Sequence, residues 1–273
     1  GGGGRGGVGA WGCGCAGGKG RGRTGYTTGT CAAAAAKAAT LALLRGRPVD
    51  AVSVNLPIGH RATLPVAWCR LDRETASCTV VKDAGDDPDV THGAEIVAVV
   101  SRQAEPGVAL RGGEGVGVVT KPGLGLPLGE AAINPVPRKM IVEAVADAAG
   151  PALQPGGLLV VISVPGGEKL ARRTLNGRLG IVGGISILGT TGVVTPYSTE
   201  AYKATISQAL AVAAAVGIDE MALVTGARSE RYAQRLYAWP EEAFVRVADY
   251  VGYGLEECAA RGMGRVVVCG MIG

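Results

Sequence analysis

Glycine recurs along the whole chain, and this feature constrains the possible folds more than any other. Of the 273 residues, 46 are glycine, whereas aromatic residues make up only 4%. The interior must therefore be packed with aliphatic and alanine side chains, and many backbone segments can approach a ligand or another strand closely. Because 47% of the residues are hydrophobic, most of the chain is predicted to fold around a packed core.

Charge, hydropathy and cysteine content exclude several classes of protein. A formal net charge of +4, evenly scattered, argues against a nucleic-acid partner or a membrane surface. No apolar run reaches the roughly 18–20 residues of a bilayer span, and the start of the chain does not look like a secretory signal, so the protein is predicted to be cytoplasmic. The seven cysteines form no CxxC pair, which favours reduced thiols. With His60 and His92 as the only histidines, no metal site is predicted.

The order of predicted elements indicates an α+β domain followed by a smaller Rossmann-like α/β domain. Residues 1–22 are expected to form a disordered glycine-rich tail. Residues 23–192 combine a helix over 31–45 and a helix that begins at Pro137 and ends before Gly150 with short strand-like runs. These runs cover residues 50–54, 61–65, 78–82, 96–100, 116–120 and 158–164. In residues 193–273 strands and helices alternate, which is typical of a parallel sheet. Ser198 and Asp249 are predicted to cap two of the helices in this part.

A threonine-rich segment precedes the first helix. Thr27, Thr28 and Thr30 lie in a loop whose hydroxyls and free N–H groups favour an anionic group at the helix N-terminus, with Thr30 as the N-cap. The alternative is that these threonines only cap the helix and shape the turn.

The densest polar cluster of the sequence is the loop over residues 82–93. Four of its carboxylates lie within seven residues, at Asp83, Asp86, Asp87 and Asp89, and His92 follows. Such a loop could contact ribose hydroxyls or a ligand ammonium group, or one carboxylate whose pKa is raised by its neighbours could accept a proton. A solvated acidic turn is the alternative.

Glycine-rich turns cover residues 111–117, 121–123, 165–168 and 180–192. None matches a P-loop or the dinucleotide-binding fingerprint, and no Ser-His-Asp or Cys-His arrangement can be assembled from the chain. Each turn alone indicates either an anion or nucleotide contact or simply a tight turn.

Taken together, these motifs resemble one family. The segments 23–32, 81–93, 112–124, 129–140, 163–168 and 179–192 are similar to those of the CbiD family of cobalt-precorrin-5B C1-methyltransferases, and the resemblance extends from about Arg23 to Gly273. It implies methyl transfer from S-adenosylmethionine to C1 of a cobalt-containing corrinoid, giving cobalt-precorrin-6A in anaerobic cobalamin synthesis. Because the family usually continues beyond the Gly-x-Ile-Gly end, the chain is expected to be a C-terminally truncated member.

The resemblance also assigns roles to residues. A sulfonium methyl is already activated, so alignment and exclusion of water suffice and no covalent nucleophile is needed. The acidic loop is expected to be catalytic, with Asp83, Asp86, Asp87, Asp89 and His92. The carboxylate arms of the substrate call for basic side chains, expected at Arg111, Lys121, Arg138, Arg172 and Arg178. The expected cofactor-binding residues are Thr27, Thr28, Thr30, Gly113, Glu114, Gly115, Gly183, Gly184, Gly189, Thr190 and Thr191.

Two other readings remain open, together with a question about assembly. The same basic and glycine-rich surface would suit a non-catalytic corrinoid- or nucleotide-binding protein. An enzyme acting on a phosphate ligand would need a Mg-dependent nucleotide activity, against which the missing P-loop argues. Cobalt is expected only as part of the substrate. A homo-oligomer is possible if a sheet ends in an uncovered strand.

Overall fold

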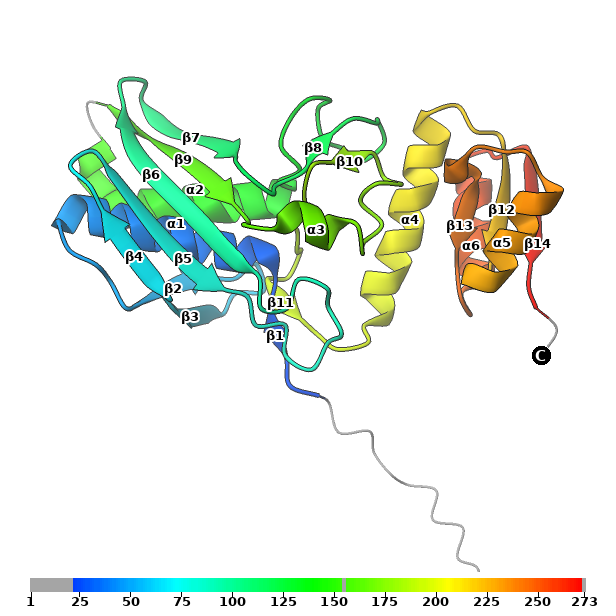
Figure 1. The fold of residues 1–273 in the computed structure, drawn as a ribbon, viewed down its shortest axis with the longest axis horizontal. Coiled ribbons are helices and arrows are strands. Elements are labelled where there is room, and N and C mark those ends of the chain that lie inside the picture. Colours follow the sequence, from blue (N-terminus) through cyan, green and yellow to red (C-terminus); the bar gives the residue numbers. More distant parts are fainter. Residues whose placement is uncertain (1–21, 154–155, 272–273) are drawn as a thin grey trace, which may run out of the picture.

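The structure is a computed structural model that describes residues 22–153 and 156–271 (Figure 1). The predicted tail over 1–22 lies outside the described residues except for Gly22. The helices are α1 (Thr28–Arg45), α2 (Pro135–Ala149), α3 (Gly167–Ala171), α4 (Thr199–Ala215), α5 (Ala227–Leu236) and α6 (Val251–Ala260), with 3-10 turns η1 (Gly150–Leu153) and η2 (Glu241–Ala243). The strands are β1 (Gly25–Tyr26), β2 (Ala51–Asn55), β3 (Arg61–Pro65), β4 (Trp68–Leu71), β5 (Thr75–Val81), β6 (Glu95–Gln103), β7 (Gly107–Gly112), β8 (Val118–Val119), β9 (Gly157–Ser163), β10 (Ile181–Val182), β11 (Val193–Val194), β12 (Glu220–Val224), β13 (Phe244–Arg246) and β14 (Arg265–Cys269).

A five-stranded sheet forms the first half of the fold. Its strand order is β4-β5-β6-β9-β7, and all neighbours are antiparallel except β7 and β9. Alternate residues such as Cys78, Ala98 and Val160 are buried because they face the helices. The sequence predicts parts of β5, β6 and β9, but it misses the partly buried strands β4 and β7.

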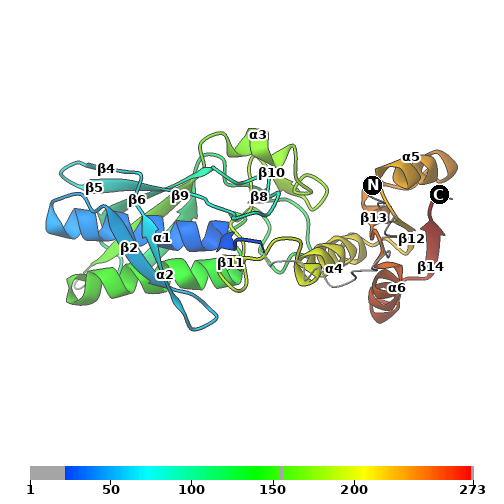
Figure 2. The ribbon, with the colours of Figure 1, turned by 90° about the horizontal axis from the view of Figure 1, so that it is seen from below.

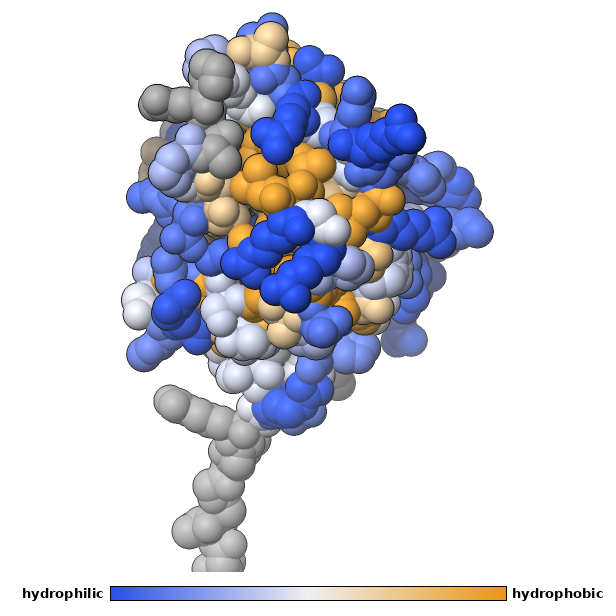
Figure 3. Space-filling model, turned by 90° about the vertical axis from the view of Figure 1, so that its left-hand side faces the viewer, coloured by the Kyte–Doolittle hydropathy of each residue, from blue (hydrophilic) through white to orange (hydrophobic). Residues whose placement is uncertain are grey.

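Helix α1 is the centre of this half. It lies between the sheet on one side and α2 on the other, with the β2–β3 hairpin alongside (Figure 2). The alanines from Ala32 to Ala36 are completely buried. Their small side chains let the sheet approach α1 on one side and α2 approach it on the other. The side of the molecule toward which the C-terminal end of α1 points in Figure 1 shows an apolar patch surrounded by hydrophilic side chains (Figure 3). Leu41, Leu43 and Leu44, in the last turns of α1, are half-buried.

The ends of α1 show how the sequence sets its length. The helix begins three residues earlier than predicted, because the side chain of Thr27, and not that of Thr30, caps it by accepting a hydrogen bond from Thr30 N. It ends as predicted at Gly46, whose φ of 65° is in the left-handed region that glycine favours.

The second half contains a parallel three-stranded sheet with the order β13-β12-β14. Helices α5 and α6 cover its opposite faces (Figure 2), and its buried residues form a separate hydrophobic cluster.

The predicted cap at Ser198 is confirmed, since its side chain accepts from Ala201 N. The predicted cap at Asp249 is wrong, because α6 starts one residue later and Tyr250 occupies the N-cap position.

The halves pack against each other, and the first half closes on its own start. Val212 of α4 packs with Val119, Leu179 and Ile181 of the first half. Strand β11 pairs with β1 at the start of the described chain, with Gly25 opposite Val194. The fold is therefore a mixed α and β structure with several sheets, in agreement with the α+β and α/β character that the sequence predicts.

The cysteines depart from the expectation of reduced thiols. Cys69 and Cys78 are register partners on β4 and β5 and are joined by a disulfide, so the expectation is wrong for this pair. Cys31 and Cys258 are free, and burial raises their pKa to about 12 and about 11. Cys13 and Cys15 lie outside the described residues.

Two further observations bear on the functional classes. Over residues 22–153 and 156–271, no helix has the length and apolar character needed to span a membrane. Within the same ranges, no three or more His, Cys, Asp or Glu side chains are grouped so that they could hold a metal ion.

The packing of α1 predicts a sharp penalty for added volume. Ala35→Leu should lower the free energy of unfolding by about 1–3 kcal/mol, because the larger side chain has no space between the sheet and α2. Ala204→Leu, on the exposed face of α4, is the matched control and should change stability by less than about 0.5 kcal/mol. Urea unfolding followed by circular dichroism measures both, and equal effects would contradict the account of α1.

Candidate functional site

The acidic loop between β5 and β6 is held by hydrogen bonds and ion pairs. Asp83 accepts from the Arg23 guanidinium, with 2.9 Å between Nη2 and Oδ1, and from Gly85 N. The Arg23 hydrogen bond lowers the pKa of Asp83 to about 2. His92 Nδ1 accepts from Ala84 N at 3.1 Å, and the ring is about half exposed.

Asp86 and Asp87 connect the loop to other segments. Asp86 accepts from the backbone N–H of Arg23 at 2.6 Å, and Asp87 accepts from that of Tyr197 at 3.1 Å. Tyr197 has a φ of 55° and an exposed side chain, directly before α4. The loop therefore lies where the chain enters β1 and where it leaves for α4.

The fourth carboxylate, Asp89, forms an ion pair with a buried lysine. The side chain of Lys82 is 1% exposed, and its Nζ lies 2.6 Å from Asp89 Oδ2. The other Asp89 oxygen accepts from Thr91 N and Oγ1, both at 2.7 Å. Burial alone would raise the pKa of Asp89, but the Lys82 and Thr91 interactions outweigh it and the pKa is lowered. The expectation of a carboxylate with a raised pKa is thus wrong for Asp83 and Asp89.

The predicted threonine cluster is buried and bonded within the protein. Thr28 Oγ1 contacts the carbonyls of Ser186 and Leu188 and accepts from Leu188 N. Thr30 Oγ1 donates to Gly192 O at 2.7 Å. These bonds use the hydroxyls that a ligand would need, and they join the N-terminus of α1 to the glycine-rich segment 186–192.

The predicted cofactor-binding glycines fall into two groups. A Cβ at Gly113, Gly115 or Gly184 would collide with neighbouring atoms, namely Ser163, Val164 or the Gly115 carbonyl. Gly189 has a φ of 132° and lies against Thr27, so any substitution there is strained. By contrast Gly183, with a φ of 84°, is open to solvent, as are Glu114, Thr190 and Thr191.

The five predicted substrate-binding cations are not brought together. Arg111 is exposed on β7, Arg172 pairs with Glu168 one turn earlier, and Arg138 lies 3.9 Å from Glu130. Only Lys121 and Arg178 reach across to the second half of the fold. Lys121 pairs with Glu242, and Arg178 pairs with Glu230 and Glu241.

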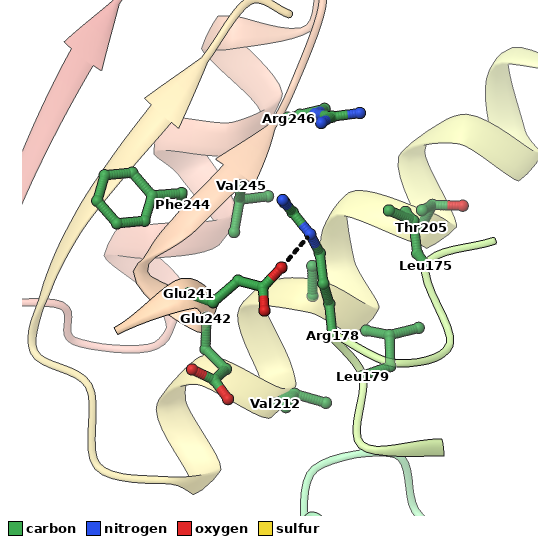
Figure 4. Close-up of a pocket in the computed structure, with 11 residues that line it drawn as sticks. Leu175, Arg178, Leu179, Thr205, Val212, Glu241, Glu242, Phe244, Val245 and Arg246 are labelled. Atoms are coloured by element: carbon green, nitrogen blue, oxygen red, sulfur yellow. Dashed lines mark ion pairs between the residues drawn. The ribbon is translucent and has the colours of Figure 1, made fainter. Parts of the chain in front are cut away.

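Arg178 and Glu242, the partner of Lys121, line a cavity that is partly open to solvent (Figure 4). It lies between the segment 175–179, helix α4 and the region from η2 to β13. Sequence reasoning identifies Arg178 but misses Glu230, Arg246, Glu241 and Glu242. The strand pattern could have indicated two of them. Arg246 ends β13 and Glu230 lies in the helix that follows β12, and the carboxyl ends of parallel strands are the usual position of ligand sites.

The Lys82–Asp89 pair predicts a large effect of a small change. Asp89→Asn should lower the free energy of unfolding by about 3 kcal/mol, because it leaves the buried Lys82 ammonium without a counter-charge. Asp83→Asn should cost much less, since water screens its exposed pair with Arg23. The double variant Lys82→Met/Asp89→Leu should regain most of the loss.

The pH dependence follows from the lowered pKa of Asp89. The contribution of the ionised Asp89 to stability is present above its unfolded-state pKa of about 3.9. It is lost as the pH falls through the lower pKa of Asp89 in the folded state. The stability difference between the wild type and Asp89→Asn should therefore be constant near neutral pH and shrink below about pH 4. Urea unfolding from pH 3 to pH 7 measures it, and a gap that widens in acid would refute the assignment.

Comparison with known proteins identifies the family. The sequence pattern of CbiD matches residues 16–196. The chain is 56% identical over 250 residues to the cobalt-precorrin-5B C(1)-methyltransferase of Geobacillus thermodenitrificans, covering 91% of this chain and 67% of that protein. It is also 56% identical over 253 residues to the enzyme of the same name from Rubrobacter xylanophilus, covering 91% of this chain and 65% of the relative.

A solved structure agrees with these relatives. The crystal structure of the cobalamin biosynthesis protein CbiD from Archaeoglobus fulgidus matches with a TM-score of 0.53 and 30% identity, over 90% of this chain and 86% of that one. The chain thus spans about two thirds of the length of its curated relatives and most of the solved structure. By sequence and by fold, the chain belongs to the CbiD family.

Proposed function

We propose that this chain transfers a methyl group from S-adenosylmethionine to C1 of cobalt-precorrin-5B, giving cobalt-precorrin-6A in anaerobic cobalamin synthesis. The observation that carries the proposal is the 56% identity over 250 residues to a protein named for this methyl transfer. The donor supplies an activated methyl group. The bond from sulfur to the methyl carbon breaks with its electron pair staying on sulfur, and a carbon–carbon bond forms from electrons of the macrocycle.

The residues of this chain have to bind, align and shield the two reactants. The donor carries a carboxylate, an ammonium group, a sulfonium and an adenosine, which calls for charges of both signs beside an apolar wall. The cavity bordered by Arg178 and Glu241 offers that combination, whereas the threonine hydroxyls of the α1 N-terminus are used within the protein.

The acceptor fits the exposed surface of the glycine-rich segments. Val118 and Val182 are register partners on β8 and β10 and are 41% and 56% exposed, and Leu128 nearby is 60% exposed. A flat macrocycle can lie on such an apolar ridge. Val118 bridges Ala131, next to Glu130, and Arg138 lies 3.9 Å from Glu130, so Arg138 can meet a carboxylate arm at this side of the ridge. We assign the open residues Glu114 and Gly183 to this surface, because Gly183 directly follows Val182 and Gly115 lies against Gly184.

In the acidic loop, the proposal assigns the chemistry to Asp86, Asp87 and His92. Asp83 and Asp89 are held ionised by Arg23 and Lys82, so their role is to fix the loop. The backbone contacts of Asp86 and Asp87 leave a second carboxylate oxygen on each side chain to meet a polar group of the ligand.

Three further aspects extend the proposal. A Rossmann-like domain would begin after residue 194, because β11 belongs to the ladder with β1 while the later strands form the parallel sheet. A homo-oligomer would form through an edge of the three-stranded sheet, because β13 and β14 each pair on one side only within the described chain. The reaction is assigned to the cytoplasm.

The direct test is methyl transfer itself. Purified protein incubated with cobalt-precorrin-5B and S-adenosylmethionine should give a singly methylated product by mass spectrometry, with S-adenosylhomocysteine formed in equal amount. Binding of the corrinoid without turnover would favour the alternative of a non-catalytic corrinoid-binding protein. Reactions without protein and with heat-denatured protein serve as negative controls.

Within the acidic loop, Asp86→Asn should lower turnover by at least about tenfold, or about 1.4 kcal/mol in the barrier. Folding should be retained, since the amide oxygen can still accept from Arg23 N. Asp72→Asn is the matched control, because Asp72 makes the same kind of backbone contact in the exposed turn before β5. Full turnover in a folded Asp86→Asn variant would remove Asp86 from the site.

A further inference from the structure

The cavity between the two halves of the fold has an apolar wall and a charged rim. Leu175, Leu179 and Val212 line one side, and Phe244 and Val245 of β13 line another. Figure 4 shows Arg178 beside Glu241, to which it is ion-paired, with Arg246 above this pair and Glu242 below it. An apolar body with charged groups at one end would match this surface.

A buried glutamate below the rim orients the two arginines. Glu230, in the first turn of α5, is 2% exposed. One of its oxygens accepts from Arg246 Nε at 2.6 Å and lies 2.5 Å from Arg246 Nη2, while the other pairs with Arg178 Nη1. A buried carboxylate held in this way fixes both guanidinium planes. The remaining N–H groups of Arg178 and Arg246, which are 24% and 41% exposed, stay available at the cavity.

The balance of charge selects the ligand. Two arginines face three glutamates, Glu230, Glu241 and Glu242, a net charge of −1 that Lys121 brings to zero through its pair with Glu242. Lys121 also lowers the pKa of Glu242, which is therefore ionised at neutral pH. A macrocycle with many carboxylates gains nothing from such a site. A ligand that carries a carboxylate and an ammonium group at one end can meet the arginines with the first and Glu241 with the second.

The position of the cavity agrees with this choice. Its charged end lies at the carboxyl end of β13 and the first turn of α5 after β12, where parallel sheets generally bind ligands. Its other border, the segment 175–179, leads directly into β10 and the Val118–Val182 ridge assigned to the acceptor. Donor and acceptor would thus lie on either side of one short segment.

We propose that this cavity is the S-adenosylmethionine site, an inference that rests on the proposed function. The donor carboxylate binds Arg178 and Arg246, its ammonium group is met by Glu241, and its adenosine lies on the leucine and valine wall. Glu230 is a positioning residue, because it acts through the two arginines.

The test uses ligands that cannot react. S-adenosylhomocysteine has the amino acid end of the donor, whereas 5′-methylthioadenosine has the adenosine and sulfur without it. By isothermal titration calorimetry, Arg178→Gln and Arg246→Gln should each weaken S-adenosylhomocysteine at least about tenfold and leave 5′-methylthioadenosine unchanged. The matched control is Arg265→Gln, which breaks the exposed pair of Arg265 on β14 with Glu220 on β12 and should bind both ligands like the wild type.

Two more variants protect the test against misfolding. Glu241→Gln keeps both partners of Glu230 and should weaken only S-adenosylhomocysteine. Ala209→Leu narrows the apolar part of the cavity and should weaken both ligands, with little change in melting temperature because Ala209 is only half-buried.

Several outcomes would overturn the inference. Unchanged S-adenosylhomocysteine affinity in the cavity variants would place the donor elsewhere, and equal loss of both ligands in the arginine variants would reduce the arginines to a structural role. Weaker binding of cobyrinic acid, a corrinoid with free carboxylates, with S-adenosylhomocysteine unaffected, would assign the cavity to the macrocycle. Failure of the proposed function is separate, since it appears as wild-type protein that binds S-adenosylhomocysteine and yet methylates nothing.

Discussion

The close packing around α1 is the constraint on which the arrangement of the first half depends. Its alanine face brings the five-stranded sheet, α2 and the β2–β3 hairpin to within van der Waals contact of one helix. The N-terminus of that helix is in turn bonded through Thr28 and Thr30 to the segment 186–192. Segments more than 150 residues apart in the sequence are therefore held together by the hydroxyls of buried threonines.

Buried charge is used in two ways in this molecule. Lys82 and Asp89 form a pair within one loop, where Asp89 also binds Thr91, and the result is a fixed backbone. Glu230 is instead shared between arginines from two parts of the chain. The first arrangement stabilises a local shape, whereas the second joins the segment after α3 to the parallel sheet and keeps cations beside a cavity.

The sequence predicts the elements whose signals are local. Gly46 and Ser198 end or begin helices because of their own backbone or side chain, and the alternation after residue 198 predicts the parallel sheet. The sequence does not distinguish Thr27 from Thr30 as the N-cap of α1, because both are good capping residues. The disulfide between Cys69 and Cys78 depends on the register of β4 and β5, which the sequence does not show. In the candidate site, the sequence predicts Arg178 as a ligand-binding residue because it is basic and lies beside a glycine-rich turn. It does not predict Glu230 and Arg246, because they meet only after the chain crosses from one parallel strand to the next.

The ladder between β1 and β11 brings the entry and exit of the first core to one place. Gly25 lies opposite Val194, Thr24 bridges Gly85, and Asp87 binds Tyr197 just beyond. The first core thus begins and ends at one place, from which the chain continues into α4. Residues added or removed after that point would leave the path of the chain through the first core unchanged, whereas they would alter the cavity that both parts line.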